Sequence, residues 1–262
     1  MNKVTKRLDD TIFALPIDND YFLSYIFPSE DIIKRVPIQE YDVNAIIHKK
    51  VVVFCDQGEG KTSLVRAIVE KGVEQYGEAN VNAVSSKGGL GELMSYGFDD
   101  KLVQIHFTDD FTLKKQDTTT IIDYFNLRHR WKEKIQRSCG LIVSIFGLHR
   151  FHSSQMEVRS TANVVVVRND SINPYDHNVI KRFIGEKGVK DLNEMEKWRE
   201  RFDELKSYSV YRTRTGRSGL LYFPLAEHDY LRDVGELRRG ELLPIGERIE
   251  LLAAWNTKQW RN

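Results

Sequence analysis

The segment from Cys55 to Thr62 carries the residue types that hold the phosphate chain of a nucleotide. A triphosphate needs several converging backbone N–H groups; glycines let the chain approach closely, and a following helix adds its positive N-terminal end. In the pattern G-x-x-x-x-G-K-[S/T], the lysine reaches the β- and γ-phosphates and the hydroxyl binds Mg²⁺. The residues that we predict to bind ATP are Gly58, Glu59, Gly60, Lys61, Thr62 and Ser63, with Thr62 also on the Mg²⁺ ion.

The flanks of this loop distinguish a phosphate site from a chance Gly-Lys-Thr in a surface turn. The apolar run Val51–Cys55 before it is typical of a buried parallel strand, and the apolar residues between 64 and 69 recur at helical spacing. Cys55 stands where the pattern has its first glycine, and a small side chain at the strand end still permits a tight turn. We therefore predict a strand, a phosphate-binding loop and a helix in that order.

An acidic pair, Asp109-Asp110, follows the predicted strand Leu102–Phe107. Nucleotide hydrolysis needs a carboxylate near the Mg²⁺ and a group that orients or deprotonates the attacking water. Ligands of open α/β sheets bind at the carboxyl ends of the strands, which is where this pair falls. We predict that Asp109 holds the Mg²⁺ and its water shell and that Asp110 stands in the position of the general base. The alternative is an acidic turn without a chemical role, such as the nearby Asp99-Asp100.

Short apolar runs alternate with helical patterns through the middle of the chain. Further strands are predicted at Val81–Val84, Leu141–Phe146 and Asn163–Val167, and helices at Leu90–Tyr96 and 119–137. This alternation predicts βαβ units and a mainly parallel sheet flanked by helices, the α/β fold of P-loop NTPases. A strand and a helix lie between the phosphate loop and the acidic pair, so we expect the type in which an additional strand separates the two signature strands.

The chain divides into three predicted parts. Residues 1–44 hold three prolines among short apolar pieces and indicate an N-terminal wrapping segment, 45–175 form the ATPase core, and 176–262 form a C-terminal extension. The extension begins with an amphipathic helix that has Met195 and Trp198 on one face. It continues with a hairpin whose strands are Tyr208–Arg214 and Leu220–Phe223.

The order of these elements resembles the FtsK–HerA group of DNA-pumping ATPases, in particular the small genome-packaging ATPases of poxvirus-like and archaeal viruses. The resemblance is carried by the loop Gly58–Thr62, the strand and acidic pair Val103–Asp110, the strand Leu141–Phe146 and the segment Arg159–Val167. It implies a ring, usually hexameric, in which an arginine of one subunit completes the ATP site of its neighbour.

The resemblance also implies roles for single residues. Arg150 and Arg159 lie between sheet strands near the expected subunit edge and are candidates for the arginine that acts on the neighbour; surface arginines in a loop are the alternative. Ser144 is the candidate for a polar sensor of the γ-phosphate, since no Gln stands at the end of its strand. Asp110 replaces the usual Glu, which leaves open a slow or partner-dependent ATPase.

Two basic segments indicate contacts to nucleic acid. Residues 127–137 hold five Lys or Arg against one acid, and residues 206–217 hold four with none. Such concentrations fit sequence-independent contacts to DNA phosphates; a solvated helix face and a solvated hairpin are the alternative. The predicted contacts come from Arg128, Arg130, Arg212, Arg214 and Arg217.

Composition excludes several other classes of protein. The net charge of +1 gives no whole-chain argument for nucleic acid, and two cysteines supply neither a disulfide framework nor a zinc site. The apolar runs are strand-sized, so we expect no membrane span and a cytoplasmic location, that of the host for a viral protein. The leading hypothesis is an ATP-hydrolysing motor for double-stranded DNA translocation or viral genome packaging. The alternatives are a nucleotide-dependent switch or assembly ATPase with low turnover, and a replication-initiator or helicase-loader ATPase.

Overall fold

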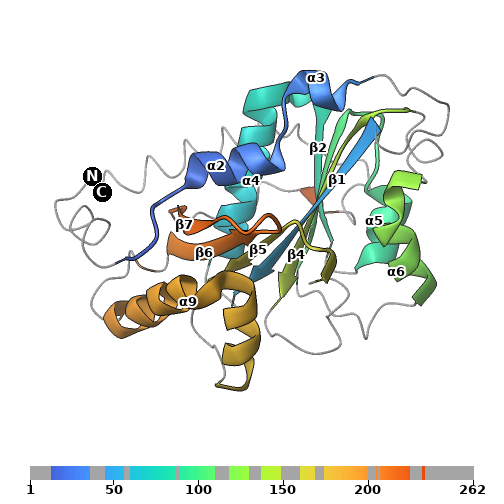
Figure 1. Ribbon diagram of the computed structural model, residues 1–262. Coiled ribbons are helices and arrows are strands. Elements are labelled where there is room, and N and C mark those ends of the chain that lie inside the picture. The colour runs from blue at the N-terminus through green and yellow to red at the C-terminus, as the bar shows by residue number, and fades with distance from the viewer. Residues whose placement is uncertain are drawn as a thin grey trace, which may run out of the picture.

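A mainly parallel sheet forms the centre of the protein (Figure 1). The computed structural model describes residues 13–35, 45–55, 60–86, 89–109, 118–129, 137–148, 160–168, 174–199, 205, 207–224 and 232–233. Within these residues the sheet has eight strands in the order β7-β6-β5-β1-β4-β3-β2-β8. The strands are β1 (Ile46–Phe54), β2 (Val81–Ser86), β3 (Val103–Thr108), β4 (Gly140–Leu148), β5 (Val164–Val167), β6 (Tyr208–Thr213), β7 (Ser218–Tyr222) and β8 (Arg232–Asp233). All neighbours from β5 to β8 are parallel, and the predicted α/β fold is confirmed.

Strand β4 lies between β1, which leads into the phosphate loop, and β3, which leads into Asp109. The expected separation of the two signature strands is therefore confirmed. The separating strand comes later in the chain than both, whereas β2, which lies between them in sequence, pairs with the outer edge of β3. Strands β3, β4 and β5 are buried along their whole length, and the nearly continuous apolar sequences of β4 and β5 reflect this burial on both faces.

Helices cover both faces of the sheet. Figure 1 shows α2, α3 and α4 on one side and α5 and α6 on the other, with the bent α9 beside the β6–β7 hairpin. Their bounds are α2 (Asn19–Ile26), α3 (Glu30–Ile33), α4 (Lys61–Tyr76), α5 (Leu90–Tyr96), α6 (Thr118–Phe125) and α9 (Pro174–Arg199), with a 3₁₀ turn at Glu78–Asn80. Each face buries its own apolar cluster, as alternation along the strands requires. No helix in the described ranges is long and apolar enough to cross a membrane.

The predicted C-terminal hairpin belongs to the same sheet as the core. Strand β6 pairs antiparallel with β5, from Val164↔Thr213 to Val167↔Val210, and β7 continues the sheet beyond it. The segment before α2 then lies along β7, where the Asp18 amide donates to the Leu220 carbonyl at 2.9 Å. The predicted boundary near residue 175 therefore separates β5 from β6 in the sequence, although these two strands are paired in one sheet.

Four polar side chains form a buried hydrogen-bonded chain on the α6 face of the sheet. His48 Nε2 and the Tyr124 hydroxyl each lie 2.8 Å from the hydroxyl oxygen of Ser144. Tyr124 also reaches His106 Nδ1 at 3.4 Å, and His106 Nε2 lies 3.2 Å from the Gly97 carbonyl oxygen. Buried polar groups are retained where they are satisfied, so this chain ties β1, β4, β3 and α6 together.

The two histidines of this chain make the fold sensitive to acid. Burial lowers the pKa of His106 to about 4, and burial followed by the charge of Lys50 lowers the pKa of His48 well below its usual range. Unfolded histidines titrate near pH 6.5, so between about pH 6.5 and 4 the unfolded chain binds protons that the folded chain does not. Folding stability should therefore fall as pH drops through this window, by up to about 3 kcal/mol for His106. Urea unfolding at pH 7 and pH 5 measures this, and equal midpoints would contradict it.

Candidate nucleotide site

The carboxyl ends of β1, β4 and β3 lie side by side at one edge of the sheet. Strand β1 ends at Phe54 and β3 at Thr108, so the sheet brings the phosphate loop and Asp109 to the same edge. Helix α4 starts at Lys61, directly after Gly60, whose φ of 82° lies in the left-handed region that favours glycine. The N-terminal end of α4, which favours anions, therefore stands at this edge.

Lys61 is a buried charged side chain of this edge, with an exposed fraction of 7%. Lysine is almost never buried unless its ammonium group has polar partners. Its Nζ atom donates to the Cys55 carbonyl oxygen at 3.3 Å and lies 3.8 Å from Oδ1 of Asp109, whose side chain is 39% exposed. Two residues predicted separately from the sequence are thus in contact across the sheet.

Gly147 on β4 makes this contact possible. It lies between the two loops, and a Cβ atom built on it would be 3.1 Å from Asp109 Oδ1 and 3.2 Å from Lys61 Cδ. Both distances are shorter than ordinary van der Waals contact. A side chain at this position would occupy the space in which Lys61 and Asp109 meet, so the strand between the two loops needs glycine there.

Arg168 is a residue of this edge that the sequence reasoning missed. It follows β5, its amide donates to the Phe54 carbonyl at 2.7 Å, and its guanidinium donates to the Gly60 carbonyl at 2.8 Å. The side chain is buried, with only 5% exposed. The signal in the sequence was a charged residue at the end of the apolar run Val164–Val167, where ligands of a parallel sheet bind. Arg168 brings a second buried cation to the start of α4.

Several predicted residues lie outside the described part of the chain. These are Gly58, Glu59, Asp110, Arg130, Arg150 and Arg159, and their roles stay predictions. Thr62 and Ser63 occupy the first turn of α4, directly after Lys61.

Ser144 lies away from this edge. It pairs with Lys50 in the middle of β1, four residues before the end of β4, and its hydroxyl is in contact with His48 and Tyr124. At about 3.3 Å per residue, four positions correspond to about 13 Å along the strand. The structure therefore does not bring Ser144 together with Lys61, because the side chain belongs to the buried chain described above.

The arginines predicted to contact DNA fall into different environments. The guanidinium of Arg212 lies close to Gly185, where α9 bends through a positive φ of 77°. Arg214 is exposed in the turn between β6 and β7, and Arg128 is exposed just beyond α6.

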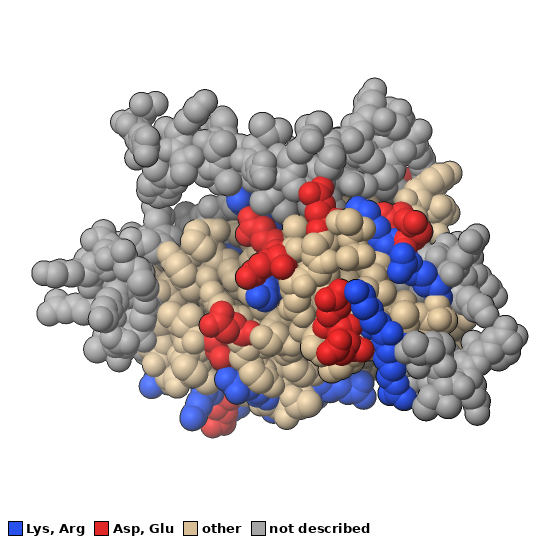
Figure 2. Space-filling model, turned by 90° about the horizontal axis from the view of Figure 1, so that it is seen from above, with Lys and Arg blue, Asp and Glu red and all other residues tan. Residues whose placement is uncertain are grey.

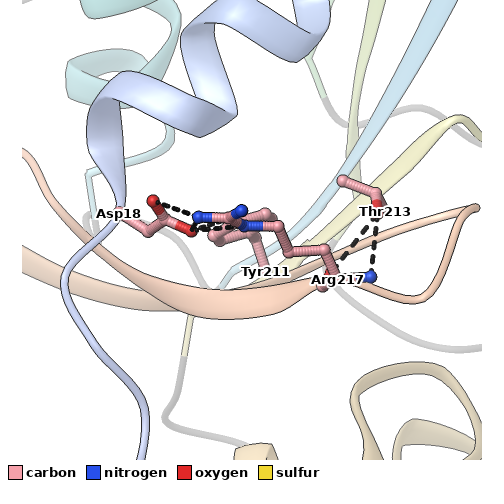
Figure 3. Close-up of polar contacts among 4 residues, drawn as sticks. All are labelled: Asp18, Tyr211, Thr213 and Arg217. Carbon is pink, nitrogen blue, oxygen red and sulfur yellow. Dashed lines mark hydrogen bonds and ion pairs between the residues drawn. The ribbon is translucent and has the colours of Figure 1, made fainter.

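Arg217 holds the segment before α2 against the hairpin (Figure 3). Its Nε and one terminal nitrogen donate to the two carboxylate oxygens of Asp18 at 2.9 and 3.0 Å. The Tyr211 hydroxyl donates to the same carboxylate at 2.7 Å, and the guanidinium lies 3.6 Å from the centre of the Tyr21 ring. This fork-like pairing commits Arg217 to a structural contact rather than leaving its charge for a phosphate.

The donor set at the β1–β4–β3 edge fits a nucleotide with Mg²⁺. The ammonium of Lys61 and the start of α4 suit phosphate oxygens, and the carboxylate of Asp109 and the hydroxyl of Thr62 are the oxygen ligands that Mg²⁺ prefers. Among the described residues, no group of three or more His, Cys, Asp or Glu side chains could hold a metal ion.

No protein-family model and no curated protein matches this sequence. Similar solved structures include the genome-packaging NTPase B204 of Sulfolobus turreted icosahedral virus 2 in complex with sulfate, at 13% identity and a TM-score of 0.44, covering 70% of this chain and 98% of that one. The same NTPase in complex with AMPPCP has 10% identity and a TM-score of 0.46, covering 69% and 99%. The pCW3 conjugation coupling protein TcpA with ATPγS has 13% identity and a TM-score of 0.39, covering 76% and 66%.

Genome-packaging ATPases, the group that the sequence resembles, are thus among the solved structures similar to this chain. At these low identities and TM-scores the similarity does not assign an activity. The function rests on the geometry of the site.

Proposed function

We propose that this chain is an ATP-hydrolysing motor that translocates double-stranded DNA, as in genome packaging. The observation that carries the proposal is the meeting of Lys61 and Asp109, 3.8 Å apart, across the strand that separates their loops. A P-loop lysine and a metal-binding carboxylate on separated strands are typical of motor and helicase-like ATPases.

In this proposal the start of α4 and Lys61 bind the phosphate chain. Backbone N–H groups of the first turn of α4 bind phosphate oxygens, and Lys61 reaches the β- and γ-phosphates. The hydrogen bond from Lys61 to the Cys55 carbonyl, at 3.3 Å, directs its side chain before a phosphate arrives. Preorganised positive charge of this kind stabilises the charge that develops during phosphoryl transfer.

Thr62 and Asp109 would hold Mg²⁺ at the same edge. When bound there, the ion would supply positive charge against the charge that develops on the phosphates. Asp109 lies beside Lys61, so the carboxylate and the ammonium share the space in which the terminal phosphates would bind. Asp110 directly follows Asp109 and is proposed to orient the attacking water. Arg150 or Arg159 is proposed to act on the site of a neighbouring subunit in a ring.

The ATPase rate with and without double-stranded DNA tests this function. A motor requires stimulation by duplex DNA, and that stimulated rate should disappear in Lys61→Ala and in Asp110→Asn. Nucleotide binding without turnover under either condition would instead indicate a switch or assembly ATPase. A chain that stays monomeric with ATP analogue and DNA present would contradict the ring.

Arg168 should position the phosphate loop. Its guanidinium donates to the Gly60 carbonyl, and a hydrogen bond to a charged group contributes about 1.5–3 kcal/mol. Arg168→Gln should therefore weaken ATP binding by about tenfold, since part of that energy holds the start of α4 in place. Isothermal titration with ATP and with ADP measures the effect. Arg168→Lys is the matched variant, which keeps the positive charge but loses the planar guanidinium. Unchanged ATP affinity in Arg168→Gln would contradict the proposed role of Arg168.

A further inference from the structure

The first half of β1 extends beyond β5, and within the described residues this side of β1 has no paired strand there, which we call the incomplete place in the sheet. Strand β5 pairs with β1 only from Val51↔Val164 onward, whereas β4 accompanies β1 from Ile46. Asn163 closes the end of β5 against β1: its amide donates to the Lys50 carbonyl at 2.8 Å, and its side-chain oxygen accepts the Lys50 amide at 2.8 Å. The turn between β6 and β7 lies at the same level, because the Arg214 amide donates to the Asn163 carbonyl at 2.7 Å.

Lys50 is where two basic segments of the sequence meet. Its Nζ atom lies 4.6 Å from the centre of the Phe125 ring, at the end of α6 and close to Arg128. Burial, then the charge of Arg128 and then that of Arg214, lower the pKa of Lys50 to about 8. The helix after β3 and the hairpin after β5, separate in the sequence, therefore act on one lysine. We name Lys50, Arg128 and Arg214 the Lys50 cluster.

The Lys50 cluster is an unfavourable arrangement of the isolated chain. Lys50 is half-buried, and the two charged groups that lower its pKa are both cations. Like charges that approach one another with partial loss of solvent destabilise the fold unless an anion joins them. Elsewhere the chain pairs its cations: Arg66 with Glu70 at 2.7 Å, and Lys71 with Glu74 at 2.9 Å. Figure 2 shows acidic and basic side chains interspersed in this way over the described part of one face.

From this convergence we propose that the Lys50 cluster binds the backbone phosphates of duplex DNA. Arg128 and Arg214 are exposed. Arg128 follows three residues after Phe125, whose ring Lys50 contacts, and Arg214 is bonded to Asn163 beside Lys50, so the three charges come from three separate elements. Three separate positive charges can each contact a phosphate along the DNA backbone, and such contacts give affinity that does not depend on the base sequence. The choice of DNA as the source of phosphate rests on the proposed function, whereas the site itself does not.

The proposal also sorts the arginines of the hairpin. Arg217 is paired with Asp18 and stacked on Tyr21, and Arg212 lies beside the bend of α9. Arg214 is the hairpin arginine whose backbone amide is bonded to Asn163, which in turn is bonded to the backbone of Lys50. Lys49, on the opposite face of β1, lies 4.3 Å from the Tyr25 ring centre and flanks the cluster. The site therefore depends on how β1, the end of α6 and the hairpin are arranged in the fold, and not on the hairpin sequence alone.

Fluorescence anisotropy with a short random-sequence DNA duplex, without nucleotide, tests the proposal. Lys50→Met, Arg128→Gln and Arg214→Gln should each lower affinity by about fivefold to tenfold and reduce the salt dependence by about one phosphate contact. Lys71→Gln, which removes the same charge from α4, is the control and should leave affinity within about twofold. Lys50→Met should also raise the melting temperature at pH 7, because it removes a charge that folding disfavours. A residue with only a structural role would lower it.

Three results would overturn the proposal. They are an equal loss of affinity in Lys71→Gln, an unchanged affinity in all three variants of the cluster, and binding to vesicles of anionic lipid that depends on the cluster while binding to the duplex does not. Without nucleotide the measurement is independent of the ATP site. If DNA binding depends on the cluster but DNA does not stimulate the ATPase, the DNA-binding site is supported and the motor function is contradicted. If DNA stimulates the ATPase and the three variants bind DNA with unchanged affinity, the motor function is supported and the DNA-binding site is contradicted.

Discussion

Replacing Gly147 with valine should lower kcat/KM for ATP hydrolysis by about 100-fold or more, since a displacement of about 1 Å at a reacting site costs that much. A Cβ atom alone would stand 3.1 Å from Asp109 Oδ1, 3.2 Å from Lys61 Cδ and 3.3 Å from Phe107 Cε2. The γ-methyl groups of valine extend further into the same space, so Lys61 and Asp109 must separate. Gly147→Ala asks the neighbours to move by only a few tenths of an ångström and should have a smaller effect, about tenfold.

Binding and stability measurements identify the cause of the Gly147→Val loss. Overpacking of this buried position should cost about 1–3 kcal/mol of stability, while affinity for an ATP analogue falls in protein that is still folded. Gly91→Ala in α5 is the matched control: a Cβ there meets only Thr120 Cγ2 at 3.9 Å, so activity should be unchanged and stability should rise by about 0.5–1 kcal/mol. Full activity in Gly147→Val would show that the contact between Lys61 and Asp109 is not part of the working site.

The local parts of this structure could be predicted from the sequence because their causes are local. Strands buried on both faces need mainly apolar sequences, so the segments 51–55, 81–84, 102–107, 141–146 and 163–167 located β1 to β5. The start of β1 at Ile46, five residues before the apolar run, was missed because its first half is only partly buried. The start of α4 at Lys61 could be predicted from the helical pattern that follows Gly60, and the structure adds that the backbone of Gly60 is left-handed.

Pairing between distant segments could not be predicted in this way. Nothing in the apolar run of β4 states that it lies between β1 and β3, and that position decides which residue must be glycine. Arg217 looked like a solvated cation of a basic hairpin, but its partner Asp18 stands 199 residues earlier. Ser144 has the right type and strand for a sensor, yet its position within β4 places its hydroxyl in the interior. Charge and residue type are local, whereas burial and partners depend on the topology.

The same limit applies to Arg168 and to the Lys50 cluster. Arg168 was a single charged residue after a strand, and only the pairing of β5 with β1 brings its guanidinium to the Gly60 carbonyl. The basic segments around Arg128 and Arg214 were predicted as two separate DNA contacts. The end of β5 links Arg214 to the backbone of Lys50 through Asn163, and the Lys50 side chain contacts Phe125, three residues before Arg128.

Asp109→Asn should have opposite effects on catalysis with Mg²⁺ and on ATP affinity without Mg²⁺. With Mg²⁺ present, kcat should fall by about 100-fold, because the amide is a poorer ligand for the ion that neutralises the developing charge. In EDTA the variant should bind ATP about threefold to fivefold more tightly than wild type, since the ion pair that competes for Lys61 is partly exposed and worth about 1 kcal/mol. Removing the carboxylate leaves the Lys61 ammonium to the phosphates alone.

The opposite signs of these two effects make the Asp109 test selective. Titration of a fluorescent ATP analogue in EDTA and in Mg²⁺, together with steady-state rates, gives both quantities from one preparation. Asp100→Asn, which neutralises an exposed acid at the other end of β3, is the matched control and should change neither. A parallel loss of affinity in EDTA and in Mg²⁺ would mean that Asp109 only supports the loop. Tighter binding in EDTA with a lost rate would mean that Lys61 exchanges Asp109 for phosphate when ATP binds.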